Sequence, residues 1–132
     1  MKYLLDTNIC IFIIKQKSNK VLHRLASCQP GEIAVSSITA AELYYGVEKS
    51  NAQEKNKLAL NSFLIPLEII DFNDQAALVY GTMRAALEKK GVPIGLLDNL
   101  IAAQAIANSL TLITNNSKEF RRVPGLSIED WS

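Results

Sequence analysis

The sequence is poor in the side chains that most often bind zinc or form a catalytic triad. It has one histidine and two cysteines in 132 residues. Zinc sites usually draw on several Cys and His ligands, and a Ser-His-Asp triad needs a placed histidine, so composition argues against both. Cys10 lies between isoleucines and forms no C-x-x-C pair with Cys28, so we expect free thiols. His23 lies at helical spacing from Leu22 and Leu25 and is interpreted as structural.

Long apolar runs and an excess of one charge are also missing. The stretch 9–14 is among the longest apolar runs, far below the roughly 18 to 20 residues that span a bilayer. Asp6 interrupts the apolar N-terminus before a signal sequence could form, so we expect a cytoplasmic protein. The formal net charge of +1, from 14 Lys and Arg against 13 Asp and Glu, gives no general signal for binding polyanions. Any chemistry must therefore depend on a few placed carboxylates.

The chain has enough apolar residues to fold as one unit. Hydrophobic residues make up 48% and charged residues 20%, which indicates a globular protein with a sizeable core. No linker, repeat or low-complexity segment divides the sequence. We expect a single domain over residues 1–132.

Short apolar strands alternate with helical stretches along the chain. We expect strands at residues 3–5, 33–36, 67–70 and 111–114, with an edge strand near 126–128. We expect helices near residues 7–16, 18–27, 39–49, 52–64, 74–90 and 98–108. This alternation predicts an α/β fold with a small, mainly parallel sheet between helices.

Four acids and one amide fall near the predicted strand ends. Asp6 follows the first strand, Glu42 lies one helical turn after the second, and Asp98 opens the helix before the fourth. Asn116 and Glu119 follow the fourth strand. Because ligands of open α/β sheets bind at the carboxyl ends of the strands, we expect these five side chains to converge. Clustered carboxylates repel one another, and a hard divalent cation with oxygen ligands would relieve this repulsion.

Each of these residues has a simpler explanation as a helix cap. Asp6 and Asp98 could be N-caps, and both Thr39-x-x-Glu42 and Asn116-x-x-Glu119 have capping-box spacing. Capping alone, however, does not require all the acids to lie at the same end of the sheet.

Two further segments are open to either interpretation. The loop 91–95, Gly-Val-Pro-Ile-Gly, could be an ordinary turn between helices or a loop that shapes the substrate site. Lys118, Arg121 and Arg122 could guide phosphates to the acids or form a solvated surface.

Five segments carry a resemblance to a known family. They are YLLDTN at 3–8, SSITAAELYYG at 36–46, PIGLLDNLIAA at 93–103, TNNSKEF at 114–120 and VPGLSIEDW at 123–131. In this order and from end to end, they resemble the PIN-domain toxins called VapC. The resemblance is nearest to members that cut initiator tRNA, tRNA(fMet), in the anticodon stem-loop. It implies a PIN-like three-layer α/β/α sandwich and a metal-dependent endoribonuclease of a type II toxin-antitoxin system.

The resemblance also implies roles for the five polar residues. Asp6 and Asp98 would be the principal Mg²⁺ ligands, with Mn²⁺ able to substitute, and Glu42, Asn116 and Glu119 would complete the pocket. It further implies a homodimer and a VapB-type antitoxin that occludes the pocket, often with a basic side chain.

The sequence departs from the family pattern at two places. Many PIN domains have Asp where Asn116 stands, which leaves Glu119 as the candidate fourth acid. Leu96 and Leu97 replace the proline-aromatic pair expected before the third acid, which could alter the fit of the substrate.

Leu43, Tyr44 and Tyr45 could mark an apolar groove where the antitoxin docks, or they could be core residues.

Two other classes also place an acid after the first strand. A phosphatase of the haloacid-dehalogenase type needs a second Asp two positions after Asp6, where this chain has Asn8. A signalling receiver domain needs paired acids after the first strand and a lysine after the last, but Asn115 and Asn116 follow Thr114 here.

Overall fold

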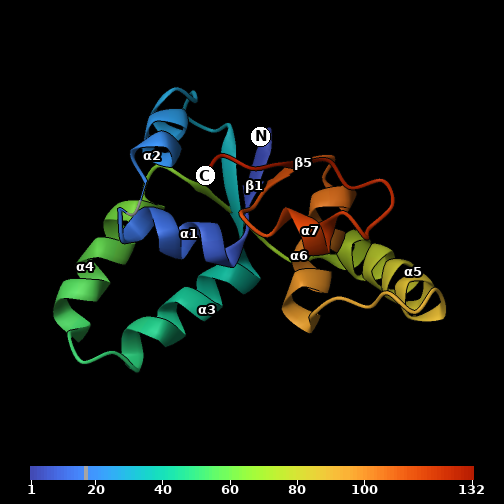
Figure 1. Cartoon of the computed structure of the whole chain (residues 1–132). Helices are drawn as coiled ribbons and strands as arrows, with labels where there is room; N and C mark the ends of the chain where they lie inside the picture. Colours follow the sequence, from blue (N-terminus) through green and yellow to red (C-terminus); the bar gives the residue numbers. More distant parts are fainter. Residues whose placement is uncertain (17) are drawn as a thin grey trace.

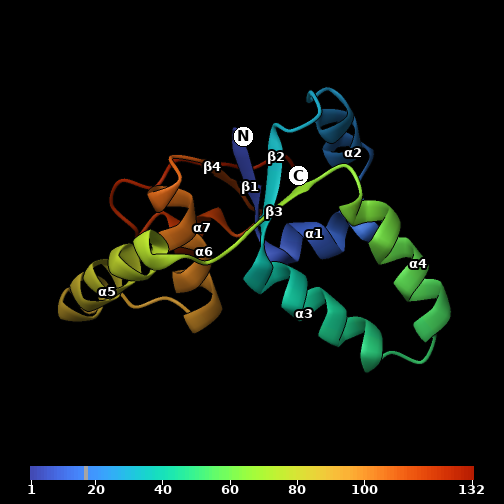
Figure 2. The same ribbon diagram turned by 180° about the vertical axis from the view of Figure 1, so that it is seen from behind.

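The protein is built around a five-stranded sheet with helices on both sides (Figures 1 and 2). The computed structural model describes residues 1–16 and 18–132. The strand order is β3-β2-β1-β4-β5, and every neighbouring pair is parallel. The predicted α/β class is thus confirmed, with a sheet that is parallel in all its pairs.

The strands lie close to their predicted positions. The bounds are β1 Tyr3–Leu5, β2 Ile33–Ser36, β3 Glu68–Ile70, β4 Thr111–Ile113 and β5 Ile128–Glu129. The edge strand begins two residues later than the sequence indicated. This delay follows from pairing, because Leu112 is in register with Ile128 and Ile113 with Glu129.

The helices differ from the prediction mainly where they begin. Their bounds are α1 Thr7–Ile14, α2 Asn19–Ala26, α3 Ser37–Glu48, α4 Gln53–Leu64, α5 Asp74–Lys89, α6 Leu96–Ala107 and α7 Ser117–Phe120. Helix α3 begins at Ser37, earlier than predicted, because the Ser36 hydroxyl accepts from the Ile38 N–H and caps it. Helix α6 begins at Leu96, and the four-residue α7 was not predicted.

Alternate strand residues supply two separate cores. Leu4 and Ala34 face the layer of α5, α6 and α7, where they pack with Leu87, Ile101 and Phe120. Their chain neighbours turn to the opposite layer of α1 to α4, forming a core that includes Leu5, Val35, Ile113, Ile9, Cys10, Ile13, Val21 and Leu60. A parallel strand buried on both faces explains the short, continuous apolar runs in the sequence.

Strand β1 lies where the order in which the chain adds strands to the sheet reverses. The chain adds β2 and β3 on one side of β1, then returns to add β4 and β5 on the other side. Ligands of open α/β sheets bind beyond the carboxyl ends of the strands at such a switch point. The topology therefore directs attention to the ends of β1 and β4.

The described residues settle three expectations from composition. None of their helices combines the length and apolar character needed to cross a membrane. Cys10 is fully buried and Cys28 partly buried, and both are free thiols. His23, interpreted as structural from its spacing to Leu22 and Leu25, is exposed on α2.

The C-terminal segment is anchored by the single tryptophan, Trp131. Its ring is only 4% exposed and meets the Tyr3 ring edge to face, with 5.0 Å between ring centroids. Its indole N–H donates to the Glu129 carboxylate at 3.0 Å, and the Arg24 guanidinium lies 5.0 Å from the ring centroid. These contacts tie the end of the chain to β1 and α2.

Replacing this anchor tests how strongly the tail contributes to stability. We expect Trp131→Ala to lower the free energy of unfolding by about 3 to 5 kcal/mol, because it removes a buried aromatic ring and leaves a cavity. Trp131→Phe keeps a ring against Tyr3 and should cost clearly less. The measurement is urea denaturation followed by circular dichroism, because both variants lack the tryptophan signal. A loss below about 1 kcal/mol for Trp131→Ala would contradict the anchoring role.

Candidate active site

Buried polar residues lie at the carboxyl ends of the three central strands. Asp6 follows β1 and is 3% exposed, Ser36 ends β2, and Thr114 follows β4, the last two being fully buried. A polar side chain buried in this way must find hydrogen-bond partners. Two of the three, Asp6 and Thr114, bind each other.

Both carboxylate oxygens of Asp6 accept hydrogen bonds. One accepts from the Ile9 N–H at 2.7 Å and caps α1, and the other accepts from the Thr114 hydroxyl at 2.5 Å. The Asp6 N–H donates to the Ile113 carbonyl at 3.0 Å, which continues the pairing of β1 with β4. The capping explanation for Asp6 is therefore right, but it accounts for only one of the two oxygens.

The pKa of Asp6 is raised from its ordinary value. Burial is the main cause, and the charge of Asp130, which follows β5, adds to it. The hydrogen bonds from Thr114 and Ile9 act in the opposite direction. Asp130 was not among the predicted site residues, although it lies after a strand end as Asp6 does.

Asp98 lies in the first turn of α6, two residues after its first residue. The N-cap of this helix is Gly95, so the N-cap explanation for Asp98 is wrong. The Gly95 N–H donates instead to the carboxylate of Glu119 at 2.9 Å. Glu119 comes from α7, so two segments far apart in the sequence meet at the start of α6.

Glu119 is held on both of its oxygens. Besides the bond from Gly95, its second oxygen accepts from the Asn116 side-chain amide at 2.9 Å. The Asn116 N–H in turn donates to the Thr114 hydroxyl at 2.9 Å. Asn116 makes no side-chain cap on α7, so the second proposed capping box is absent. A chain of hydrogen bonds thus runs from Asp6 through Thr114 and Asn116 to Glu119.

Asp98 and Glu119 lie side by side as like charges. A Cβ built on Gly95 would be 3.6 Å from an Asp98 carboxylate oxygen and 3.8 Å from a Glu119 oxygen. Burial, followed by the charge of Glu119, a hydrogen bond with the Glu119 side chain and the charge of Asp6, raises the pKa of Asp98 to about 7. The pKa of Glu119 is lowered, chiefly by the Gly95 N–H. The three acids are therefore close enough to influence one another's protonation.

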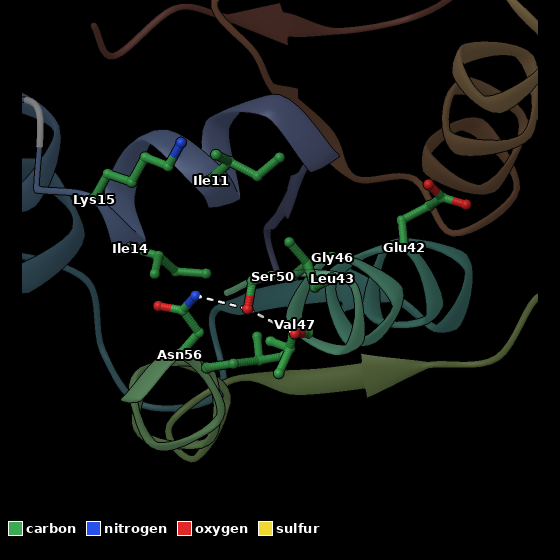
Figure 3. A pocket seen from close by; sticks show the side chains of 10 residues that line it. Ile11, Ile14, Lys15, Glu42, Leu43, Gly46, Val47, Ser50 and Asn56 are labelled. Atoms are coloured by element: carbon green, nitrogen blue, oxygen red, sulfur yellow. Dashed lines mark hydrogen bonds between the residues drawn. The ribbon is translucent and has the colours of Figure 1, made fainter. Parts of the chain in front are cut away.

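Glu42 stands apart from these three acids. It is exposed on α3, and its charge is not among those that shift the pKa of Asp6 or Asp98. The capping box proposed with Thr39 is wrong, because Ser36 caps α3 and the buried Thr39 hydroxyl pairs with that of Thr7 at 3.0 Å. In Figure 3, Glu42 lies at the edge of a pocket and points away from its apolar side chains.

The donor set suits a hard cation with few protein ligands. Over residues 1–16 and 18–132, no three acidic, histidine or cysteine side chains are arranged to hold a metal ion together. Magnesium, however, usually binds one or two carboxylates and keeps several waters. In the same described residues, no Lys or Arg forms an ion pair with Asp6, Asp98 or Glu119. Neighbouring carboxylates that lack such a partner fit a divalent cation held by Asp6 and Asp98.

An apolar groove lies between α1, α3 and α4 (Figure 3). Its cavity volume is about 330 Å³, and its apolar lining is Ile11 and Ile14 of α1, Leu43, Gly46 and Val47 of α3, and Leu60 of α4. Lys15 and Glu42 lie at its polar margin. Of the three residues predicted to mark a docking groove, Leu43 lines it and is mostly buried, while Tyr44 and Tyr45 are 47% and 59% exposed.

Thr114, like Asp130, is a residue of this site that the sequence analysis missed. It was assigned to the fourth strand without a role, yet it is the partner of Asp6. The signal was present in the sequence, since a polar residue directly after two buried apolar residues repeats the pattern of Leu4-Leu5-Asp6.

Known proteins share this arrangement over the full chain. The protein-family description "PIN domain" matches residues 3–126. A Salmonella typhimurium protein named tRNA(fMet)-specific endonuclease VapC is 44% identical over 131 residues, covering 99% of this chain and 98% of that protein. Ribonuclease VapC2 of Rickettsia felis is 48% identical over 132 residues, with 99% and 98% covered.

A solved structure agrees with the sequence relatives. The structure titled "Crystal structure of DNA bound VapBC from Salmonella typhimurium" has a TM-score of 0.95 and 44% identity, covering 100% of this chain and 99% of that one. These matches argue against the phosphatase and receiver alternatives. Since the family match runs from β1 almost to β5 and full-length relatives share nearly half of the residues, this chain belongs to the PIN-domain family and, within it, to the VapC group.

Proposed function

We propose that this protein is a Mg²⁺-dependent endoribonuclease, the toxin of a type II toxin-antitoxin pair, and that it cuts tRNA(fMet) in the anticodon stem-loop. The observation that supports this most directly is the meeting of Asp6, Asp98 and Glu119 at the switch point of the sheet without an ion-paired cation in the described chain. Relatives named as a ribonuclease and a tRNA(fMet)-specific endonuclease supply the substrate class.

Asp6 and Asp98 would hold the metal ion, and Mn²⁺ could take its place. When bound, such an ion polarises a phosphoryl oxygen and lowers the pKa of a coordinated water. The protein's own part is to fix the carboxylates. Asp6 is fixed by Ile9 and Thr114, and Asp98 by its place in the first turn of α6. Glu119, which keeps its charge, or Glu42 would orient the attacking water.

The antitoxin would be of the VapB type and would lay an apolar segment into the groove between α1, α3 and α4. The VapBC title of the Salmonella structure names this kind of partner for that protein. The groove suits such a segment because its lining is apolar and it ends near Glu42, where a basic side chain could approach the acids. A homodimer is part of the same proposal.

The first test removes one carboxylate that caps nothing. We expect Asp98→Asn to lower kcat/KM for tRNA cleavage by at least about 100-fold, because it removes a metal ligand while the new amide can still donate a hydrogen bond to Glu119. The same change should abolish growth inhibition in cells. Glu68→Gln, which neutralises an exposed acid on β3, is the matched control and should cleave at the normal rate. Normal cleavage by a folded Asp98→Asn protein would refute the assignment.

The second test measures metal binding without any substrate. At about 100 times its Kd, Mn²⁺ should stabilise the native protein by about 2.7 kcal/mol and raise Tm by several degrees. In EDTA, Asp98→Asn should melt no lower than the native sequence, because it removes the repulsion between Asp98 and Glu119. Differential scanning calorimetry gives both values. If Mn²⁺ shifts Tm equally for Asp98→Asn and the native sequence, the proposed metal site is wrong.

The third test fills the groove. Gly46 lies in α3 and has open space where a side chain would project, so Gly46→Leu should fold normally and obstruct the cavity. We expect the Kd for a VapB-type antitoxin to rise at least about tenfold, while RNA cleavage persists. Gly81→Leu makes the same change in α5, also into open space, and should bind normally. Isothermal titration calorimetry is the measurement, and equal affinities would exclude this groove as the docking site.

A further inference from the structure

The loop 91–95 is tied to the segment that follows β4. The Arg122 guanidinium donates to the Pro93 carbonyl at 2.9 Å, and the Gly95 N–H donates to Glu119 at 2.9 Å. Within the loop, the Ile94 carbonyl accepts from the buried Asn99 side chain at 3.1 Å. Three successive loop residues are therefore held in place, two of them by partners more than twenty residues away along the chain.

This loop determines where Asp98 lies. Gly95 is the N-cap of α6, and Asp98 is the third residue of that helix. In a capping box, the acid at this third position bonds back to the N-cap N–H. Here Glu119 takes that N–H instead, which leaves the Asp98 carboxylate free of capping. The direction of Asp98 thus depends on the link between the loop and α7.

Arg122 supports this link through the loop. It holds the Pro93 carbonyl, two residues before the Gly95 N–H that donates to Glu119. The two neighbouring cations differ. All three side chains are exposed, but those of Lys118 and Arg121 make no hydrogen bond or ion pair within residues 1–16 and 18–132. One cation of the three is therefore built into the site, although all three look alike in the sequence.

We propose that Arg122 is a positioning residue of the active site, which fixes the loop 91–95 and Glu119 and so holds Asp98 toward Asp6. This inference rests on the proposed function, and it assigns Arg122 a different role from contact with RNA phosphates. Because the bond to Pro93 is exposed, it contributes little to stability. Its effect is on the geometry of the reacting groups, where a displacement of about 1 Å can cost about 100-fold in rate.

The experiment compares Arg122→Ala, Arg122→Lys and Arg121→Ala for kcat, KM and Mn²⁺ affinity. We expect Arg122→Ala to lower kcat about 10- to 100-fold and to weaken Mn²⁺ binding about tenfold, with KM and Tm nearly unchanged. Arg122→Lys should recover most of kcat, because an ammonium group can donate to the Pro93 carbonyl and keeps the charge beside Glu119. Arg121→Ala removes the same charge one residue away and should keep kcat and Mn²⁺ affinity.

Two results would overturn the inference. The first is a rise in KM that is equal for Arg122→Ala and Arg121→Ala, shrinks at high salt and leaves kcat unchanged, which is the behaviour of phosphate contacts. The second is an unchanged Mn²⁺ affinity in Arg122→Ala. If Arg122→Ala does not fold, Arg122→Gln replaces it, with the same expected direction. If the native protein cuts no RNA, the proposed function fails, and the Mn²⁺ comparison alone decides the role of Arg122.

Discussion

The hydrogen bond between Asp6 and Thr114 is the contact on which the site depends. It joins the ends of β1 and β4 at the switch point of the sheet. It also fixes the Asp6 carboxylate oxygen that does not cap α1. Through the same threonine hydroxyl, the Asn116 N–H is held, and Asn116 holds Glu119. Asp98 then lies against Glu119, so four elements are oriented by one short polar chain. Without these hydrogen bonds, the sheet would bring the acids to one edge but would not fix the orientation of their side chains.

Sequence patterns predicted the fold class well because strand burial and the alternation of strands with helices can be read from local stretches of sequence. The apolar pairs Leu4-Leu5 and Leu112-Ile113 mark central strands, and the alternation with helices implies a parallel sheet, in which carboxyl ends share an edge. The helix starts were less predictable. The choice between Ser36 and Thr39 as the cap of α3 depends on Thr39 being buried against Thr7, a contact across 32 residues.

Most members of the site were predictable from the sequence, but Thr114 and Asp130 were missed, and the hydrogen bonds between the members were not predictable. The sequence identified Asp98, Asn116 and Glu119 as polar residues near strand or helix ends, and the structure brings them together. It could not show that Glu119 caps α6 in place of a local residue, because that bond joins positions 24 residues apart. Nor could charge alone distinguish Arg122 from Arg121, since the difference is one hydrogen bond to a loop carbonyl.

Helix α1 links the groove to the carboxylate site, because Asp6 caps this helix, whereas Asp98 and Glu119 come from α6 and α7. Helix α1 is capped by Asp6 and presents Ile11 to the groove one and a half turns later. Helix α3 presents Glu42 at the edge of the groove and Leu43 inside it. Each of these two helices therefore connects the groove with one carboxylate, α1 with Asp6 and α3 with Glu42.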